Sequence, residues 1–204
     1  MNEFDLSKEE MKAYGYKIID HIVEHFDTVE SKNPVASASR EEMDAVFLQE
    51  APNEATPANE VLDFVMKNVI PFSNLTTHPK SFSFVPGPSN FISTLADTLA
   101  TGFNIFSGGW VASPAAAELE IVTMNWLLKM FNFPVTKGGG LFTSGGSMAN
   151  LTALVTARRI KCGDDFSKAV IYLSDQAHSS NIKAIRILGF KKEQIRIIPT
   201  DLEF

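Results

Sequence analysis

The segment TSGGSMAN (residues 143–150) joins two stretches of different character. Before it lies a short apolar run, residues 141–143, which we predict to be a strand; after it, residues 148–160 have the spacing of a helix. The glycines at 145 and 146 let the backbone approach an anion closely, and Ser147 adds a hydroxyl donor. The first amides of a helix, with the positive end of its dipole, favour an anion. The segment therefore predicts a phosphate cradle, although a tight turn without any ligand remains an alternative, because no nucleotide-binding spacing is present.

The next segments repeat the pattern of strand and helix. We predict a strand at residues 169–173, a helix at 179–188 and a strand at 195–198. Short connections in this order are typical of parallel strands covered by helices, that is, of an α/β fold. Such sheets bind ligands at the carboxyl ends of their strands. The loop SDQAHSS (residues 174–180) therefore belongs at the same edge as the glycine-rich turn.

His178 is the candidate catalytic residue of that second loop. An imidazole can lie flat on another ring and can hold or move a proton near neutral pH. The alternative is that Asp175 or Ser179 caps the following helix and that His178 is a surface residue.

Amphipathic helices are predicted in the amino-terminal third of the chain. One covers residues 6–29, a second begins at Ser39 with a capping-box pattern, and a third follows Thr56, with Pro57 at its first position. Residues 78–88 are too rich in proline to be helical. Further helices are expected over residues 91–101 and from Pro114, on either side of a glycine-containing loop at 103–110.

Composition limits the function classes. The 204 residues carry a net charge of −6 and a single cysteine, Cys162, and no apolar run reaches the about 20 residues that cross a bilayer. We expect a cytoplasmic protein that binds neither nucleic acid nor membrane. His21 and His25 have the spacing of metal ligands on a helix, but no third ligand lies near them, and we expect no metal.

Four segments carry a family resemblance: HPKSFSFVPGP (residues 78–88), GGWVASPAAAELE (108–120), GLFTSGGSMANLTALVTARR (140–159) and YLSDQAHSSNIKA (172–184). In order and spacing they resemble the group II pyridoxal-phosphate-dependent decarboxylases of the aromatic-L-amino-acid type. The FVPGP loop is most similar to bacterial tryptophan-decarboxylase-like members. The resemblance implies the large domain of a fold type I (aspartate aminotransferase-like) PLP-dependent transferase. Residues 76–204 would form its first part, incomplete, preceded by a helical dimerisation arm at residues 1–75.

The resemblance also implies roles for individual residues. The cofactor would be pyridoxal 5'-phosphate, with its phosphate at Gly146 and Ser147 in the turn that begins at Gly145, and with its pyridine ring against His178. The expected substrate-binding residues are Phe84, Val85, Pro86, Gly87 and Phe106, the last of these, with Gly108, reaching the site of the second subunit of a homodimer. Apolar walls, and no cation after Lys80 in that loop, favour an aromatic amino acid over glutamate or aspartate.

The expected Schiff-base lysine is missing from the pattern. Lys183, Lys191 and Lys192 follow His178, but none stands in the family's histidine–lysine motif. We therefore expect an amino-terminal portion that is inactive alone. Two other functions stay open: a serine hydrolase with Ser147 as nucleophile and Asp175 and His178 as its partners, and a non-catalytic dimerisation module.

Overall fold

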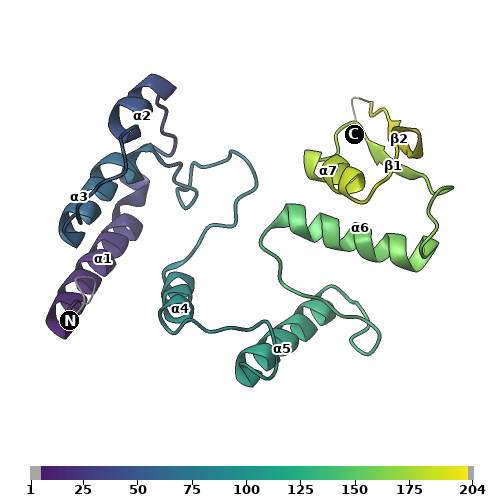
Figure 1. The fold of residues 1–204 in the computed structure, drawn as a ribbon, viewed down its shortest axis with the longest axis horizontal. Helices are drawn as coiled ribbons and strands as arrows, with labels where there is room; N and C mark the ends of the chain where they lie inside the picture. Colours follow the sequence, from purple (N-terminus) through teal and green to yellow (C-terminus); the bar gives the residue numbers. More distant parts are fainter. Residues whose placement is uncertain (1–5, 202–204) are drawn as a thin grey trace. The chain divides into compact units, whose positions relative to one another are not determined.

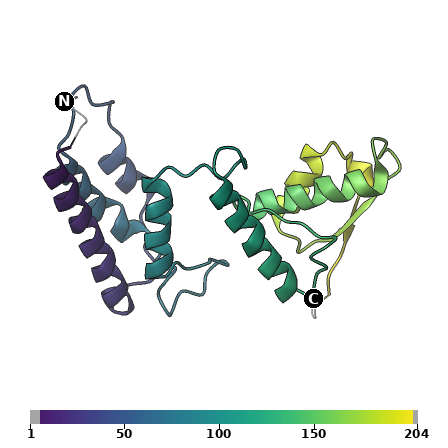
Figure 2. The same ribbon diagram turned by 90° about the horizontal axis from the view of Figure 1, so that it is seen from below.

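The computed structural model describes residues 6–201. Its contacts divide the chain into two units, with the boundary between Asn104 and Ile105. Figures 1 and 2 show the ribbon of both units. The division into a dimerisation arm at 1–75 and a cofactor domain from 76 onward concerns roles in a larger protein, and it stays a prediction.

Helices make up the regular structure of the first unit. Its elements are α1 (Lys8–Thr28), η1 (Val29–Ser31), α2 (Arg40–Phe47), α3 (Ala58–Asn68), η2 (Ile70–Phe72) and α4 (Phe91–Gly102). The predicted capping box at Ser39 is confirmed: its hydroxyl accepts from the Glu42 amide, and the Glu42 side chain accepts from the Ser39 amide. Pro57 is the N-cap of α3, not its first helical residue as predicted.

Side chains hold these helices together. Lys17 of α1 forms an ion pair with Asp63 of α3 at 2.7 Å. The ring of Phe47, at the end of α2, meets Phe64 of α3 edge-on, with 5.7 Å between centroids. Figure 1 shows α1, α2 and α3 side by side. An amphipathic helix gains most of its stability from packing its apolar face, and the contact of Phe47 with Phe64 is of this kind.

A buried histidine fixes the start of the extended segment. Only 4% of His78 is exposed, and its Nδ1 accepts a hydrogen bond from the Lys80 amide at 2.9 Å. An amide can only donate, so the neutral ring carries its proton on Nε2 and donates to the Glu30 carbonyl at 3.3 Å. His78 therefore ties the segment to η1.

The second unit alternates helices with strands. Its elements are α5 (Pro114–Met130), α6 (Gly146–Cys162), β1 (Ile171–Ser174), α7 (Ser179–Ile187), η3 (Lys192–Gln194) and β2 (Ile195–Ile198). The parallel pairing of β1 with β2 is confirmed, in a register that places Ile171 opposite Ile195. Figure 2 shows this unit from a second direction. Ile185, Leu188 and Phe190 form its buried core, against which Leu151 and Leu154 of α6 pack.

The strand predicted at residues 141–143 is absent. The described residues contain two strands, which pair with each other. A strand requires a hydrogen-bonded neighbour, and here the amide of Phe142 donates to the carboxylate of Glu120 at 3.1 Å instead. The prediction was wrong because an apolar run indicates burial but does not supply a partner strand.

Over the described residues, none of the helices combines the length and the apolar character needed to cross a membrane.

Candidate cofactor site

The glycine-rich turn forms the first turn of α6. Gly145 is its N-cap and has φ +153°, a backbone conformation that residues with a side chain rarely adopt. Its carbonyl accepts from the amides of Met148 and Ala149, at 3.0 and 3.1 Å. No side chain caps the helix, and in the described part of the chain the amides of Gly146 and Ser147 have no acceptor. Two donors at the positive end of α6 are therefore available.

The space in front of these amides is open. A Cβ atom built on Gly146 would meet no heavy atom within 4 Å, and the side chain of Ser147 is exposed. Free amides, a hydroxyl and room for the ligand are what a phosphate group requires. The turn therefore fits the phosphate of pyridoxal phosphate.

His178 is the N-cap of α7. Its Nδ1 accepts from the Ser180 amide at 3.2 Å and lies 2.8 Å from the Ser180 hydroxyl. Because the amide can only donate, the neutral ring carries its proton on Nε2. The ring is exposed, and Nε2 has no partner among the described residues. The alternative in which Asp175 or Ser179 caps α7 is wrong, since His178 performs the capping itself.

A hydrogen bond joins the two predicted loops. Asn150 Nδ2, one turn into α6, donates to Ser180 Oγ on α7 at 2.8 Å. Ser180 is only 3% exposed. We expected the glycine-rich turn and the histidine loop to lie close together, and the hydrogen bond between Asn150 and Ser180 connects them. Sequence reasoning gave neither a role, although both lie within the quoted motifs.

Asp175 serves a different purpose. Its carboxylate accepts from the Thr200 hydroxyl at 2.8 Å and from the Thr200 amide at 3.3 Å, and its own amide donates to Ile198. The Thr200 hydroxyl lowers the pKa of Asp175. A hydrolase triad needs the carboxylate to accept from the histidine Nδ1–H, but here Nδ1 is itself an acceptor. The geometry therefore does not support a serine hydrolase.

The residues predicted to bind substrate lie on two loops, one in each unit. In the first unit Phe84 and Val85 are exposed, Phe84 has φ +62°, and Phe84 and Pro86 line a cavity of about 310 Å³. In the second unit the ring of Phe106 covers Gly108 so closely that a Cβ atom there would lie 2.5 Å from the ring. Their role in binding an amino acid stays a prediction.

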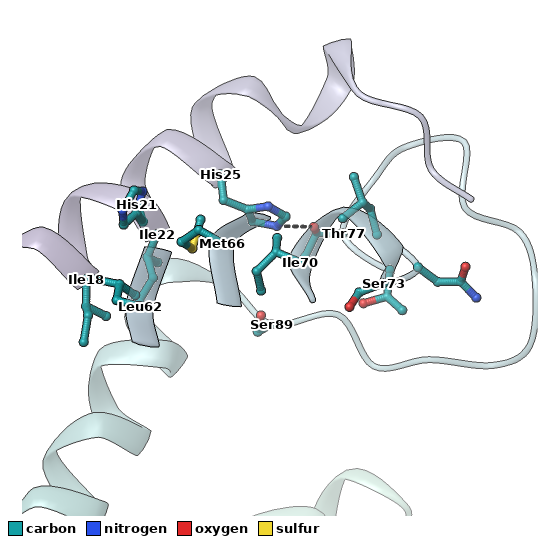
Figure 3. A pocket seen from close by; sticks show the side chains of 13 residues that line it. Ile18, His21, Ile22, His25, Leu62, Met66, Ile70, Ser73, Thr77 and Ser89 are labelled. Atoms are coloured by element: carbon teal, nitrogen blue, oxygen red, sulfur yellow. Dashed lines mark hydrogen bonds between the residues drawn. The ribbon is translucent and has the colours of Figure 1, made fainter. Parts of the chain in front are cut away.

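A larger pocket, of about 400 Å³, lies in the first unit between α1, α3 and residues 70–77 (Figure 3). Most of its lining is apolar, and it includes His21 and His25. His25 Nε2 lies 3.3 Å from the Thr77 hydroxyl, and burial lowers the pKa of His25, with the charge of Lys32 acting in the same direction. In residues 6–201, no three His, Cys, Asp or Glu side chains are grouped as metal ligands would be.

Comparison with known proteins gives a consistent result. Residues 41–204 match the model of the pyridoxal-dependent decarboxylase conserved domain. The chain is 44% identical over 201 residues to an aromatic-L-amino-acid decarboxylase of Bacillus atrophaeus, covering 96% of this chain and 41% of that protein. It is 30% identical to a phenylacetaldehyde synthase of Arabidopsis thaliana, covering 96% of this chain and 42% of that protein.

Solved structures agree. The crystal structure of Catharanthus roseus tryptophan decarboxylase in complex with L-tryptophan superposes with a TM-score of 0.86 at 28% identity, over 98% of this chain and 45% of that one. The match shows the fold of the large domain in PLP-dependent decarboxylases. The chain spans less than half the length of the relatives that it matches. It belongs to the pyridoxal-dependent decarboxylase family.

Proposed function

We propose that the full-length protein containing this chain is a pyridoxal-phosphate-dependent decarboxylase that converts an aromatic amino acid into its amine and CO2. One observation carries the proposal. The open amino terminus of α6, with free amides at Gly146 and Ser147, is joined through Asn150 and Ser180 to the loop that presents His178.

Each part of this arrangement has a role in the reaction. When bound, pyridoxal phosphate supplies the electron sink for the carbanion left by the loss of CO2. The amides of Gly146 and Ser147, with the Ser147 hydroxyl, would hold the phosphate. His178 would pack its ring against the pyridine ring and present Nε2–H, which has no acceptor among the described residues, toward the reacting groups.

The substrate class follows from the loop at residues 84–87. Phe84 and Pro86 offer rigid apolar walls, whereas Val85 and Gly87 leave room. In the segment that contains this loop, residues 78–88, no cation follows Lys80 to pair with a side-chain carboxylate. An aromatic side chain suits these residues, and we expect tryptophan or phenylalanine to be preferred over a catechol. The relatives named above support an aromatic substrate.

The test is a decarboxylation assay of the full-length protein, supplied with pyridoxal phosphate, across aromatic, acidic and aliphatic amino acids. Release of CO2 is measured, and the product is identified as amine or aldehyde. We expect turnover of aromatic substrates to the amine. A clear preference for glutamate, or an aldehyde as the main product, would contradict the proposal.

A further inference from the structure

The contacts around His178 form a chain of hydrogen bonds with a defined direction. Asn150 Nδ2 donates to Ser180 Oγ at 2.8 Å, and Ser180 Oγ lies 2.8 Å from His178 Nδ1. The Ser180 amide also points at Nδ1, at 3.2 Å. Since Oγ already accepts from Asn150, the Ser180 hydroxyl is left to donate its own proton to Nδ1, whose single lone pair it shares with the more distant Ser180 amide.

Burial makes this direction costly to reverse. Ser180 is 3% exposed, so water cannot readily replace either of its partners. A hydroxyl buried without partners costs free energy, and the packed arrangement therefore favours the state in which every donor has an acceptor. That state leaves the imidazole proton on Nε2.

His78 shows the same local pattern with a different outcome. Its Nδ1 also accepts from an amide two residues ahead, that of Lys80, but its Nε2 donates to the carbonyl of Glu30. Both nitrogens of His78 are used to hold the fold. At His178 the protein fixes only Nδ1, and in the described residues nothing accepts from Nε2.

We propose that Asn150 and Ser180 are positioning residues that fix the ring orientation of His178 and keep its neutral form in the Nε2–H tautomer. The consequence of this inference for catalysis, that Nε2–H faces the reacting groups, rests on the proposed function. A group that fixes the tautomer of a catalytic histidine acts through that ring and needs no contact with the substrate.

Two variants separate this role from simple packing. Ser180→Ala removes the hydroxyl that donates to Nδ1. Asn150→Asp reverses the chain, because a carboxylate only accepts; the Ser180 hydroxyl then turns toward residue 150 and leaves an oxygen lone pair facing Nδ1. Ser179→Ala is the matched control, because Ser179 is the adjacent serine on the same helix, is exposed, and forms no side-chain hydrogen bond with any residue that the structure describes.

The measurement is nitrogen-15 NMR of histidine-labelled full-length protein, which distinguishes the two tautomers by their ring nitrogen shifts. It is recorded with and without pyridoxal phosphate, and His178 is assigned from the His178→Asn variant. We expect the Nε2–H form in the wild type. In Ser180→Ala only the longer bond from the Ser180 amide, at 3.2 Å, still opposes a proton on Nδ1, so the Nδ1–H fraction should rise. It should rise further in Asn150→Asp, where an oxygen lone pair faces Nδ1. The His78 signals should stay unchanged as an internal reference.

Activity gives the second readout. In Ser180→Ala we expect kcat to fall roughly ten- to a hundred-fold, as for other groups that orient a functional ring, with little change in KM. Unchanged tautomers in both variants, or full kcat in Ser180→Ala, would overturn the inference. A wild type that binds no cofactor and decarboxylates nothing would refute the proposed function instead, because the tautomers are read in the cofactor-free protein as well.

Discussion

We expect Gly146 to contribute to the cofactor site by having no side chain. A Cβ atom there meets nothing within 4 Å, so Gly146→Val should fold, but its methyl groups would fill the space that the phosphate needs. Hydrogen bonds to a charged group each contribute about 1.5–3 kcal/mol, and loss of the two from Gly146 and Ser147 would weaken pyridoxal phosphate binding by roughly 100-fold or more. Equilibrium dialysis of full-length protein measures this. Gly102→Val, at a glycine with equal room in α4, is the control, and equal affinity in the two variants would argue against the cradle.

His178 caps α7, and we propose that it also acts in turnover; substitutions can separate these two roles. His178→Ala removes both the ring and the cap of α7, and loss of a cap costs about 1 kcal/mol of stability. His178→Asn keeps an N-cap acceptor but has no imidazole. We expect both variants to lose most of kcat and only the alanine variant to unfold earlier in urea. Undiminished turnover in His178→Asn would leave His178 as a capping residue alone.

The loop at residues 84–87 allows a test of substrate size. Gly87→Thr and Val85→Phe add bulk where the loop is small, so the double variant should prefer smaller rings. We expect discrimination against tryptophan to grow by on the order of 1–3 kcal/mol relative to wild type. Ratios of kcat/KM for tryptophan and phenylalanine measure the change, and an unaltered ratio would place the side-chain pocket elsewhere.

At the scale of elements, the sequence was informative wherever local chemistry decides the structure. Ser39 with Glu42, and the helical spacing of residues 6–29, gave α2 and α1 because caps and amphipathic faces depend on nearby residues. The strand at 141–143 could not be judged in this way, since a strand is defined by its partner. The hydrogen bond between Asn150 and Ser180 joins residues 30 positions apart, so no local sequence pattern predicts it.

The end of β2 is held to the loop after β1 by Thr200 and Asp175, and this contact should depend on pH. Because the Thr200 hydroxyl lowers the pKa of Asp175, the ionised carboxylate stabilises the folded state above the unfolded pKa. That contribution is lost as the pH falls through the folded pKa. Thr200→Val should therefore be less stable than wild type at neutral pH, and the difference should vanish in acid. Urea unfolding of full-length protein at both pH values measures it; a difference that persists in acid would assign the loss to packing.

At the scale of the whole molecule, we expect a homodimer, and this chain, which spans less than half the length of its relatives, exposes apolar side chains that a second copy could cover. Leu48 in the first unit, and Phe103, Phe106 and Trp110 on the loop at 103–110, are more than half exposed. Burying such surfaces between copies is a common route to symmetric dimers. We expect full-length protein to sediment as a homodimer and to lose activity on dilution to the monomer. A monomer with full activity would contradict this.

We expect the first turn of α6 and the loop of His178 to form one pyridoxal phosphate site. A crystal structure of the full-length protein with pyridoxal phosphate tests it most directly. We predict the phosphate within hydrogen-bonding distance of the amides of Gly146 and Ser147, with the pyridine ring stacked on His178. A phosphate bound elsewhere, or a pyridine ring out of contact with His178, would contradict the account.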